Sequence, residues 1–231
     1  MEASPVRPTF LNLPPEKRER IIDAALAEFA DKGFEQASLN AVVAVSGIAK
    51  GSLYQYFTDK QGIFLYLFEV AVGVVRRTLL GVKEETREAD VFTRLEKSLM
   101  AGVDFLRRHP RLFGLYLRIL YDQRTPRRQE LLAAVRRFAA DYFASLVRQG
   151  LSRGEIRAEV SPEAAIFLLD AVFDRFLQAV AMPAFDVTLG LNQAAAEEVA
   201  VRGRELIELL RRGLAPPGRN WQDTGRGGQG A

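Results

Sequence analysis

Apolar residues recur at spacings of three and four through most of this chain, which is the pattern of helices that bury one face. The first apolar stripe predicts a helix from about Pro15 to Lys32, ended by Gly33, and a long apolar helix follows Lys60. Further helices are predicted at residues 91–108, 111–122, 126–150, 162–181 and 194–213. The sequence lacks the alternating pattern of strands, so we predict an all-α fold.

Between Ser38 and Lys60 the pattern predicts two short helices joined by a tight turn. Ser38 suits the N-cap of the first helix, because its hydroxyl can accept from a free backbone N–H. Ser46-Gly47 breaks the pattern, since glycine takes the left-handed conformation at a helix end without steric penalty. The second helix turns Leu53, Tyr56 and Phe57 inward. It leaves a polar N-terminal side, as in a DNA-binding helix-turn-helix, made of Lys50, Gly51, Ser52, Tyr54 and Gln55.

Three linked motifs occupy this region in order: AALAEFADKGFEQASL, KGSLYQYF and a trailing DK. They resemble the DNA-binding domain of the TetR family of bacterial transcriptional regulators, from Arg18 to the helix after Asp59. The rest of the chain resembles that family by its helical pattern, its length and the phrase GLSRGEIRAEVSPEAA. The resemblance implies an N-terminal three-helix DNA-binding domain followed by a larger helical domain for ligand binding and dimerisation.

We expect four regions along the chain. Residues 1–15 contain four prolines and are expected to form a flexible N-terminal arm, in which Arg7 either touches DNA or makes no contact. Residues 16–61 form the DNA-binding domain, with the helix-turn-helix at about 38–57. Residues 62–213 form the ligand-binding and dimerisation domain, and residues 214–231, rich in glycine and polar residues, form a disordered tail.

The resemblance assigns DNA contacts to individual positions of this sequence. Ser38, Tyr56 and Lys60 match phosphate-binding positions, and Asn40 matches a candidate adenine reader. The structural alternatives are a helix cap for Ser38, a core position for Tyr56 and a solvated side chain for Asn40. Ala49 departs from the family pattern, which often has a hydroxyl as the recognition-helix N-cap. The groove-facing positions of the recognition helix are Lys50, Gly51, Ser52, Tyr54 and Gln55.

The helix predicted at 162–181 is apolar on several faces, so it needs cover on several faces. One side can pack on its own chain and the other on a partner, giving a two-fold homodimer through a four-helix bundle, as is usual in the resembling family. Burial of both faces within one subunit is the alternative. The expected interface residues are Ile166, Leu169, Phe173, Phe176, Leu177, Val180, Leu206 and Leu210.

The larger domain is expected to hold a small lipophilic effector, because family members release DNA when such a molecule moves the two DNA-binding domains. An anionic group on the effector would suit Arg118 or Arg124, whereas a cationic one would suit Asp104, Asp170 or Asp174. Each aromatic candidate for the cavity can instead be ordinary core. The candidate effector-binding residues are Phe92, Phe105, Phe113, Tyr116, Arg118, Phe138, Tyr142 and Phe173.

Composition narrows the function classes. The net charge is +3, yet residues 1–62 carry seven basic and eight acidic side chains, so the charge total alone does not indicate a DNA-binding surface. The chain has no cysteine and one histidine, His109, so we expect no metal site and no cofactor. No apolar run reaches the roughly 18 to 20 residues of a membrane span. We therefore expect a cytoplasmic protein without a membrane partner.

Two motif matches would point to an enzyme if their surroundings fitted. Residues 150–154 match the G-x-S-x-G nucleophile elbow, but this motif needs a preceding strand, and here a helix is predicted. Gly225, Gly227 and Gly230 match G-x-G-x-x-G only within the tail. We expect no catalytic residue. The predicted function is a dimeric repressor that binds a palindromic operator in double-stranded DNA and is released by its ligand; a helical protein-interaction module and an activator are the alternatives.

Overall fold

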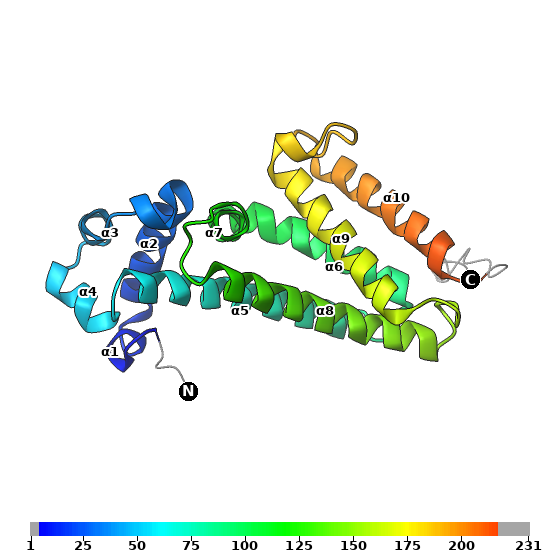
Figure 1. The fold of residues 1–231 in the computed structure, drawn as a ribbon, viewed down its shortest axis with the longest axis horizontal. Helices are drawn as coiled ribbons and strands as arrows, with labels where there is room; N and C mark the ends of the chain where they lie inside the picture. Colours follow the sequence, from blue (N-terminus) through cyan, green and yellow to red (C-terminus); the bar gives the residue numbers. More distant parts are fainter. Residues whose placement is uncertain (1–4, 217–231) are drawn as a thin grey trace, which may run out of the picture. The chain divides into compact units, whose positions relative to one another are not determined.

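The computed structural model describes residues 5–216 (Figure 1). Over this range the fold is all-α, as predicted: it has no strand, and Val6 and Phe57 form one isolated antiparallel bridge. The elements are α1 (Pro8–Leu11), α2 (Pro15–Gln36), α3 (Leu39–Ser46), α4 (Lys50–Tyr56), α5 (Lys60–Glu85), α6 (Val91–Arg108), α7 (Pro110–Tyr121), α8 (Arg128–Ser152), α9 (Pro162–Ala181), the short 3-10 helix η1 (Pro183–Phe185) and α10 (Ala196–Leu214).

The predicted helices are confirmed, and their ends have local causes. Helix α9 begins where the Ser161 hydroxyl accepts from the backbone N–H of Ala164 at 3.2 Å, with Pro162 as its first residue. In α2, Gly33 has φ 72° and ψ 175°, which interrupts the helix at the predicted stop before one further turn. Phe34 then packs on Phe29, with ring centroids 6.1 Å apart.

Within the described residues the chain forms two compact units. The first comprises residues up to Glu84 together with Ala101–Phe138, and the second comprises Glu85–Met100 together with residues from Ala139 onward. This division does not follow the boundary expected between residues 61 and 62. The reason is packing: Leu112, Leu115 and Ile119 of α7 are buried in the same apolar cluster as Phe29 of α2.

The segment expected to be an extended, flexible arm differs in the structure. Residues 8–11 form helix α1, and the side chain of Phe10 is completely buried. Figure 1 shows α1, in dark blue, at the end of α4, with which it makes contact. Prolines do not prevent this, because Pro8 is the first residue of α1 and Pro15 the first of α2. The tail predicted as disordered lies outside the described residues from 217 onward.

The second unit has its own core, in which Phe92, Leu95 and Leu99 of α6 and Leu169 of α9 are buried. Helices α6 and α10 approach closely at Gly203, where an added Cβ would lie 2.5 Å from the Met100 methyl carbon. A side chain at that position would therefore require the flexible end of the Met100 side chain to move.

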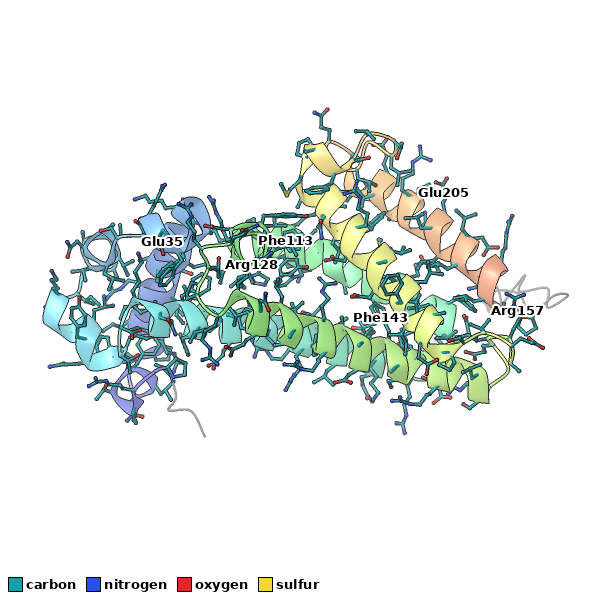
Figure 2. The ribbon with its side chains drawn as sticks, viewed as in Figure 1. Glu35, Phe113, Arg128, Phe143, Arg157 and Glu205 are labelled. Atoms are coloured by element: carbon teal, nitrogen blue, oxygen red, sulfur yellow. The ribbon has the colours of Figure 1, made fainter. Side chains whose placement is uncertain are left out.

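Basic side chains from other elements bind the carbonyls at several helix ends, where no intrahelical N–H is available. Arg128, labelled in Figure 2, donates to the Ile119 and Leu120 carbonyls at the end of α7, at 2.9 and 2.5 Å. Arg157, also labelled there, donates to the Gly213 carbonyl at the end of α10.

Arg94 does the same just beyond α5. Its side chain is 4% exposed and donates to the Thr86 carbonyl at 2.5 Å, the Thr86 hydroxyl at 2.8 Å and the Gln149 amide oxygen at 2.7 Å. All of these partners are neutral, so the guanidinium acts as a buried helix cap within the second unit.

Candidate nucleic-acid interface

Helices α3 and α4 form the predicted helix-turn-helix. The Ser38 hydroxyl accepts from the Ala41 N–H at 3.4 Å, which confirms it as the N-cap of α3. Gly47 ends α3 in the left-handed conformation, with φ 67° and ψ 33°, and its N–H donates to the Val43 carbonyl at 3.1 Å. Ala49 occupies the N-cap position of α4 and supplies no side-chain hydrogen bond.

One face of α4 is buried and the other is open to solvent. Leu53, Tyr56 and Phe57 are buried, as predicted, at 1%, 7% and 2% exposure. The open face has Tyr54 at 46% exposure and a half-buried Ser52, beside the exposed Lys50, Gly51 and Gln55. A cation, an amide, a hydroxyl and a phenol on one short helix match the groups that contact phosphates and base edges.

The two lysines assigned to DNA differ in their surroundings. Among the described residues, the exposed Lys50 has no hydrogen-bond or ion-pair partner. Lys60 donates to the Glu35 carbonyl at 3.0 Å, and its ammonium lies 4.9 Å from the centroid of the Phe34 ring. Lys60 therefore also caps the end of α2, and a phosphate contact would compete with that hydrogen bond.

The remaining assigned DNA contacts divide between surface and core. Asn40 is exposed on the first turn of α3. Tyr56 is buried, and its ring lies 5.8 Å from that of Phe10 and 6.0 Å from the Lys17 ammonium. This packing gives Tyr56 a core role.

A carboxylate from α2 holds the start of α3. Glu28 accepts from the backbone N–H of Ser38 at 2.8 Å and from Lys32 at 2.8 Å. The hydrogen bond from Lys32, followed by that from Ser38, holds the pKa of Glu28 below its ordinary value of 4.5, against the effect of burial. The ionised carboxylate therefore stabilises the junction between α2 and α3.

Sequence reasoning missed two features next to α4. Val45 of α3 is 76% exposed. The N-terminal segment also contacts α4, because the Arg7 N–H donates to the Tyr56 carbonyl at 2.8 Å and the Thr9 hydroxyl to the Gln55 carbonyl at 2.5 Å. The available signal was Phe10, a large aromatic residue among prolines.

The residues expected to bind an effector lie in both units. Phe105, Phe113, Tyr116, Arg118 and Phe138 belong to the first unit, and Phe92, Tyr142 and Phe173 belong to the second.

Several of these side chains already have partners. Arg118 donates to the Ala30 carbonyl at 3.0 Å and to the Asp31 carbonyl, so it ties α7 to α2. Tyr116 is hydrogen-bonded to Arg136. Tyr142 shares a 2.5 Å hydrogen bond with Ser98, and burial raises the pKa of its phenol. Each of these three polar groups therefore has a structural role.

The residues expected at a dimer interface form two groups, one buried and one partly exposed. Leu169, Phe173, Phe176 and Leu210 are buried within the single chain, at 0–8% exposure. The other four are partly exposed: Ile166, Leu177, Val180 and Leu206.

The most exposed apolar side chains of α9 and α10 are different ones. Phe167 and Leu168 on α9 are 77% and 41% exposed, and Val201 and Leu209 on α10 are 42% and 64% exposed. The sequence pattern showed that α9 is apolar on several faces but did not show which face its own chain covers.

An all-α protein with an open recognition helix after a glycine-containing turn has the structure of a helix-turn-helix DNA-binding protein. Residues 21–67 match the description "Bacterial regulatory proteins, tetR family", and residues 89–215 match "Tetracyclin repressor-like, C-terminal domain". The chain belongs to the tetR family of bacterial regulatory proteins and is a transcriptional regulator.

Known structures agree with this assignment. A TetR family transcriptional regulator from Chloroflexus aurantiacus J-10-FL is 31% identical, with a TM-score of 0.68 over 90% of this chain and 98% of that one. FadR from Bacillus subtilis in complex with stearoyl-CoA has the same fold, with a TM-score of 0.67 at 19% identity over 84% of this chain and 98% of that one.

Two curated relatives match at lower identity than the Chloroflexus aurantiacus regulator. The probable acrEF/envCD operon repressor of Escherichia coli K12 is 22% identical over 165 residues, which is 70% of this chain and 74% of that protein. The uncharacterised regulator YerO of Bacillus subtilis is 28% identical over 116 residues, and the match spans 50% of this chain and only 39% of YerO. In residues 5–216, no helix is long and apolar enough to cross a membrane.

Proposed function

We propose that this protein is a homodimeric repressor that binds a palindromic operator and leaves DNA when a small lipophilic molecule binds its helical domain. The DNA-binding part rests on the open face of α4, where Lys50 has no partner within residues 5–216 and Tyr54 is 46% exposed. An exposed cation without a carboxylate partner can bind a phosphate without first losing an ion pair.

Relatives support the finer parts of this proposal. The Escherichia coli relative is described as a probable operon repressor. AibR, which shares this fold at 16% identity with a TM-score of 0.61 over 82% of this chain and 97% of that one, is described in complex with isovaleryl coenzyme A and operator DNA. FadR is described with stearoyl-CoA. These names favour an acyl thioester or a related lipophile as the effector class.

The exposed apolar residues of α9 and α10 favour a homodimer. Phe167 is 77% exposed and Leu209 is 64% exposed, which is costly for side chains of this size in a monomer. We assign the interface to this surface, made of Phe167, Leu168, Val201 and Leu209 with the partly exposed Leu177 and Leu206 at its margin. A two-fold axis through it would present two copies of α4 and require a palindromic site.

The link between α7 and α2 supplies a physical route for release within the first unit. Arg118 of α7 donates to the Ala30 and Asp31 carbonyls of α2, just before the interruption at Gly33, and an added Cβ at Gly33 would lie 3.1 Å from the Asp122 carboxylate. Because these contacts are close, a displacement of α7 would move the end of α2. Effector and DNA would then favour different positions of α2, and each would weaken the binding of the other.

The direct test is selection from a random double-stranded DNA library with the purified protein at near-physiological salt. We expect an enriched palindrome, and sedimentation of the complex should give two chains per site. Enrichment of a site without two-fold symmetry would contradict the dimer. If no sequence is enriched, the proposed function is wrong and the protein-interaction alternative is favoured.

Effector release is tested on the selected operator. Stearoyl-CoA, isovaleryl-CoA and stearate are titrated into the preformed complex, with coenzyme A as the control for the nucleotide part. We expect release by at least one acylated compound and none by coenzyme A. Release by coenzyme A alone would contradict a lipophilic effector.

A further inference from the structure

The segment before α2 closes the C-terminal end of α4. A helix end leaves its last carbonyls without intrahelical donors. In α4 two of these carbonyls are bound from outside: Tyr56 O accepts from the Arg7 N–H at 2.8 Å and Gln55 O from the Thr9 hydroxyl at 2.5 Å. Both donors lie within three residues of each other, at the start of α1.

An aromatic side chain anchors this segment. Phe10 has no exposed surface, and its ring centroid lies 4.6 Å from that of Phe57, 5.8 Å from that of Tyr56 and 5.3 Å from that of Tyr66. Phe10 therefore packs on the last residues of α4 and on α5 together. Val6, which is 6% exposed, forms a bridge with Phe57 beside it.

The start of α5 also accommodates the segment. At Gly62 an added Cβ would lie 2.9 Å from the Pro5 carbonyl oxygen, so a side chain there would displace the N-terminal segment. The N-terminal segment thus contacts α4 and the first turn of α5 through Pro5, Arg7, Thr9 and Phe10.

Helix α4 needs such support because little else within it favours the helix. It has seven residues, its N-cap position is Ala49 without a side-chain acceptor, and Gly51 lies in its first turn. Helices this short are marginal in water without tertiary contacts. The contacts of its C-terminal end with residues 5–11 therefore help to keep the DNA-facing residues in one orientation.

We propose that residues 5–11, the N-terminal clip, hold the recognition helix in its DNA-binding position, with Phe10 and Thr9 as positioning residues. This inference rests on the proposed function. It goes beyond that function because the clip precedes residues 21–67, the segment that matches the tetR family. A clip fixes the position of Lys50 and Tyr54 without touching DNA itself.

The test compares Phe10→Ala with Leu11→Ala, since Leu11 is the next residue of α1 and is 49% exposed. Operator affinity is measured well below the unfolding temperature, together with amide hydrogen exchange of residues 50–57 in the free protein. We expect Phe10→Ala to weaken operator binding by about tenfold and to speed exchange across α4. Leu11→Ala should leave both within about twofold of the wild type.

Outcomes separate positioning from simple core packing. If Phe10→Ala lowers the unfolding temperature but leaves operator affinity and α4 exchange unchanged, Phe10 is only a core residue and the proposal is wrong. If the wild type selects no DNA sequence, the proposed function fails. The exchange measurement then still decides whether the clip holds α4.

A milder variant covers the case in which Phe10→Ala does not fold. Thr9→Val keeps the shape of an exposed side chain and removes only the hydroxyl that donates to the Gln55 carbonyl. We expect it to weaken operator binding by about threefold and to speed exchange at the end of α4. Unchanged affinity and exchange in Thr9→Val would overturn the proposal.

Discussion

The basic side chains of the recognition helix and those at the helix ends have opposite surroundings. Lys50 projects from the exposed side of α4 and has no partner among the described residues. Arg94 and Arg128 are bound to backbone carbonyls at or just beyond the end of another helix, and Arg118 to carbonyls just before the Gly33 interruption of α2. Among the described residues, the basic side chain of one region is therefore open to solvent, and those of the other bind carbonyls.

This difference explains why the net charge of the chain does not indicate where the candidate DNA-binding surface lies. The chain carries a net charge of +3, but many of its arginines lie outside the helix-turn-helix, and several of them are occupied by carbonyls. Lys60 belongs to both groups, because it matches a phosphate-binding position and caps α2 through the Glu35 carbonyl. Predictions that separate stability from DNA binding test this distinction.

The largest effect is expected for the buried helix cap. Arg94→Met should lower the free energy of unfolding by about 3 kcal/mol, because it leaves buried carbonyl and amide oxygens without donors. Urea denaturation measures the change. Arg87→Met is the control, since the Arg87 side chain is exposed between α5 and α6. The salt dependence of operator binding should stay that of the wild type; a flatter dependence would mean that Arg94 also serves DNA.

On the recognition helix we expect a substitution to weaken DNA binding and to leave the free energy of unfolding unchanged. Lys50→Ala should reduce operator affinity by about tenfold and flatten the salt dependence by about one unit of slope, because one phosphate contact is lost. Its free energy of unfolding should not change. Lys97→Ala, which removes an exposed lysine from α6, is the control. An equal loss of slope in both variants would contradict a local phosphate contact.

The missing N-cap of α4 offers a gain of stability. Ala49→Ser should raise the free energy of unfolding by about 1 kcal/mol, because a hydroxyl can then accept from a free N–H of the first turn. Thermal unfolding and amide exchange of α4 measure it. Ala44→Ser, at an exposed position inside α3, should give no gain. A gain at Ala44 alone would contradict a capping effect.

The smallest effect is expected on the free energy of unfolding when the Glu28 carboxylate is protonated at low pH. The pKa of Glu28 is lowered by its hydrogen bonds from Lys32 and Ser38, so the carboxylate stabilises the fold above its ordinary pKa of 4.5. This stabilisation is lost as pH falls through the lowered pKa. The difference in unfolding free energy between wild type and Glu28→Gln should therefore favour the wild type at pH 7 and shrink toward pH 3.

The control for the acid experiment is Glu35→Gln, because the Glu35 carboxylate is exposed and has no hydrogen-bond partner among the described residues. A wild-type advantage over Glu28→Gln that stays constant down to pH 3 would contradict the role of the ionised carboxylate.

The helices and the turn of the DNA-binding domain follow from local chemistry. Apolar spacing, the Ser38 cap and the left-handed Gly47 act within a few residues, so the sequence alone predicted α3, α4 and the direction in which Leu53 points. The same spacing predicted α6 and α9 at their observed bounds. The family resemblance came from the same segment.

Contacts between distant residues required the tertiary structure. The pattern of prolines suggested a mobile arm, but the burial of Phe10 depends on Phe57 and Tyr66, which lie some fifty residues later. Likewise, the apolar circumference of α9 indicated burial without showing that Leu169 faces its own chain and Phe167 faces solvent.

The helices, the helix-turn-helix and the polar side chains of α4 could be predicted from the sequence, because they depend on near neighbours. The partners of the basic residues and the contacts of α1 with α4 could not, because they join residues far apart in the chain. The physical reason is that a carbonyl at a helix end takes its donor from whichever element packs there, as with Arg157 and Gly213, and spacing along the chain does not encode that choice.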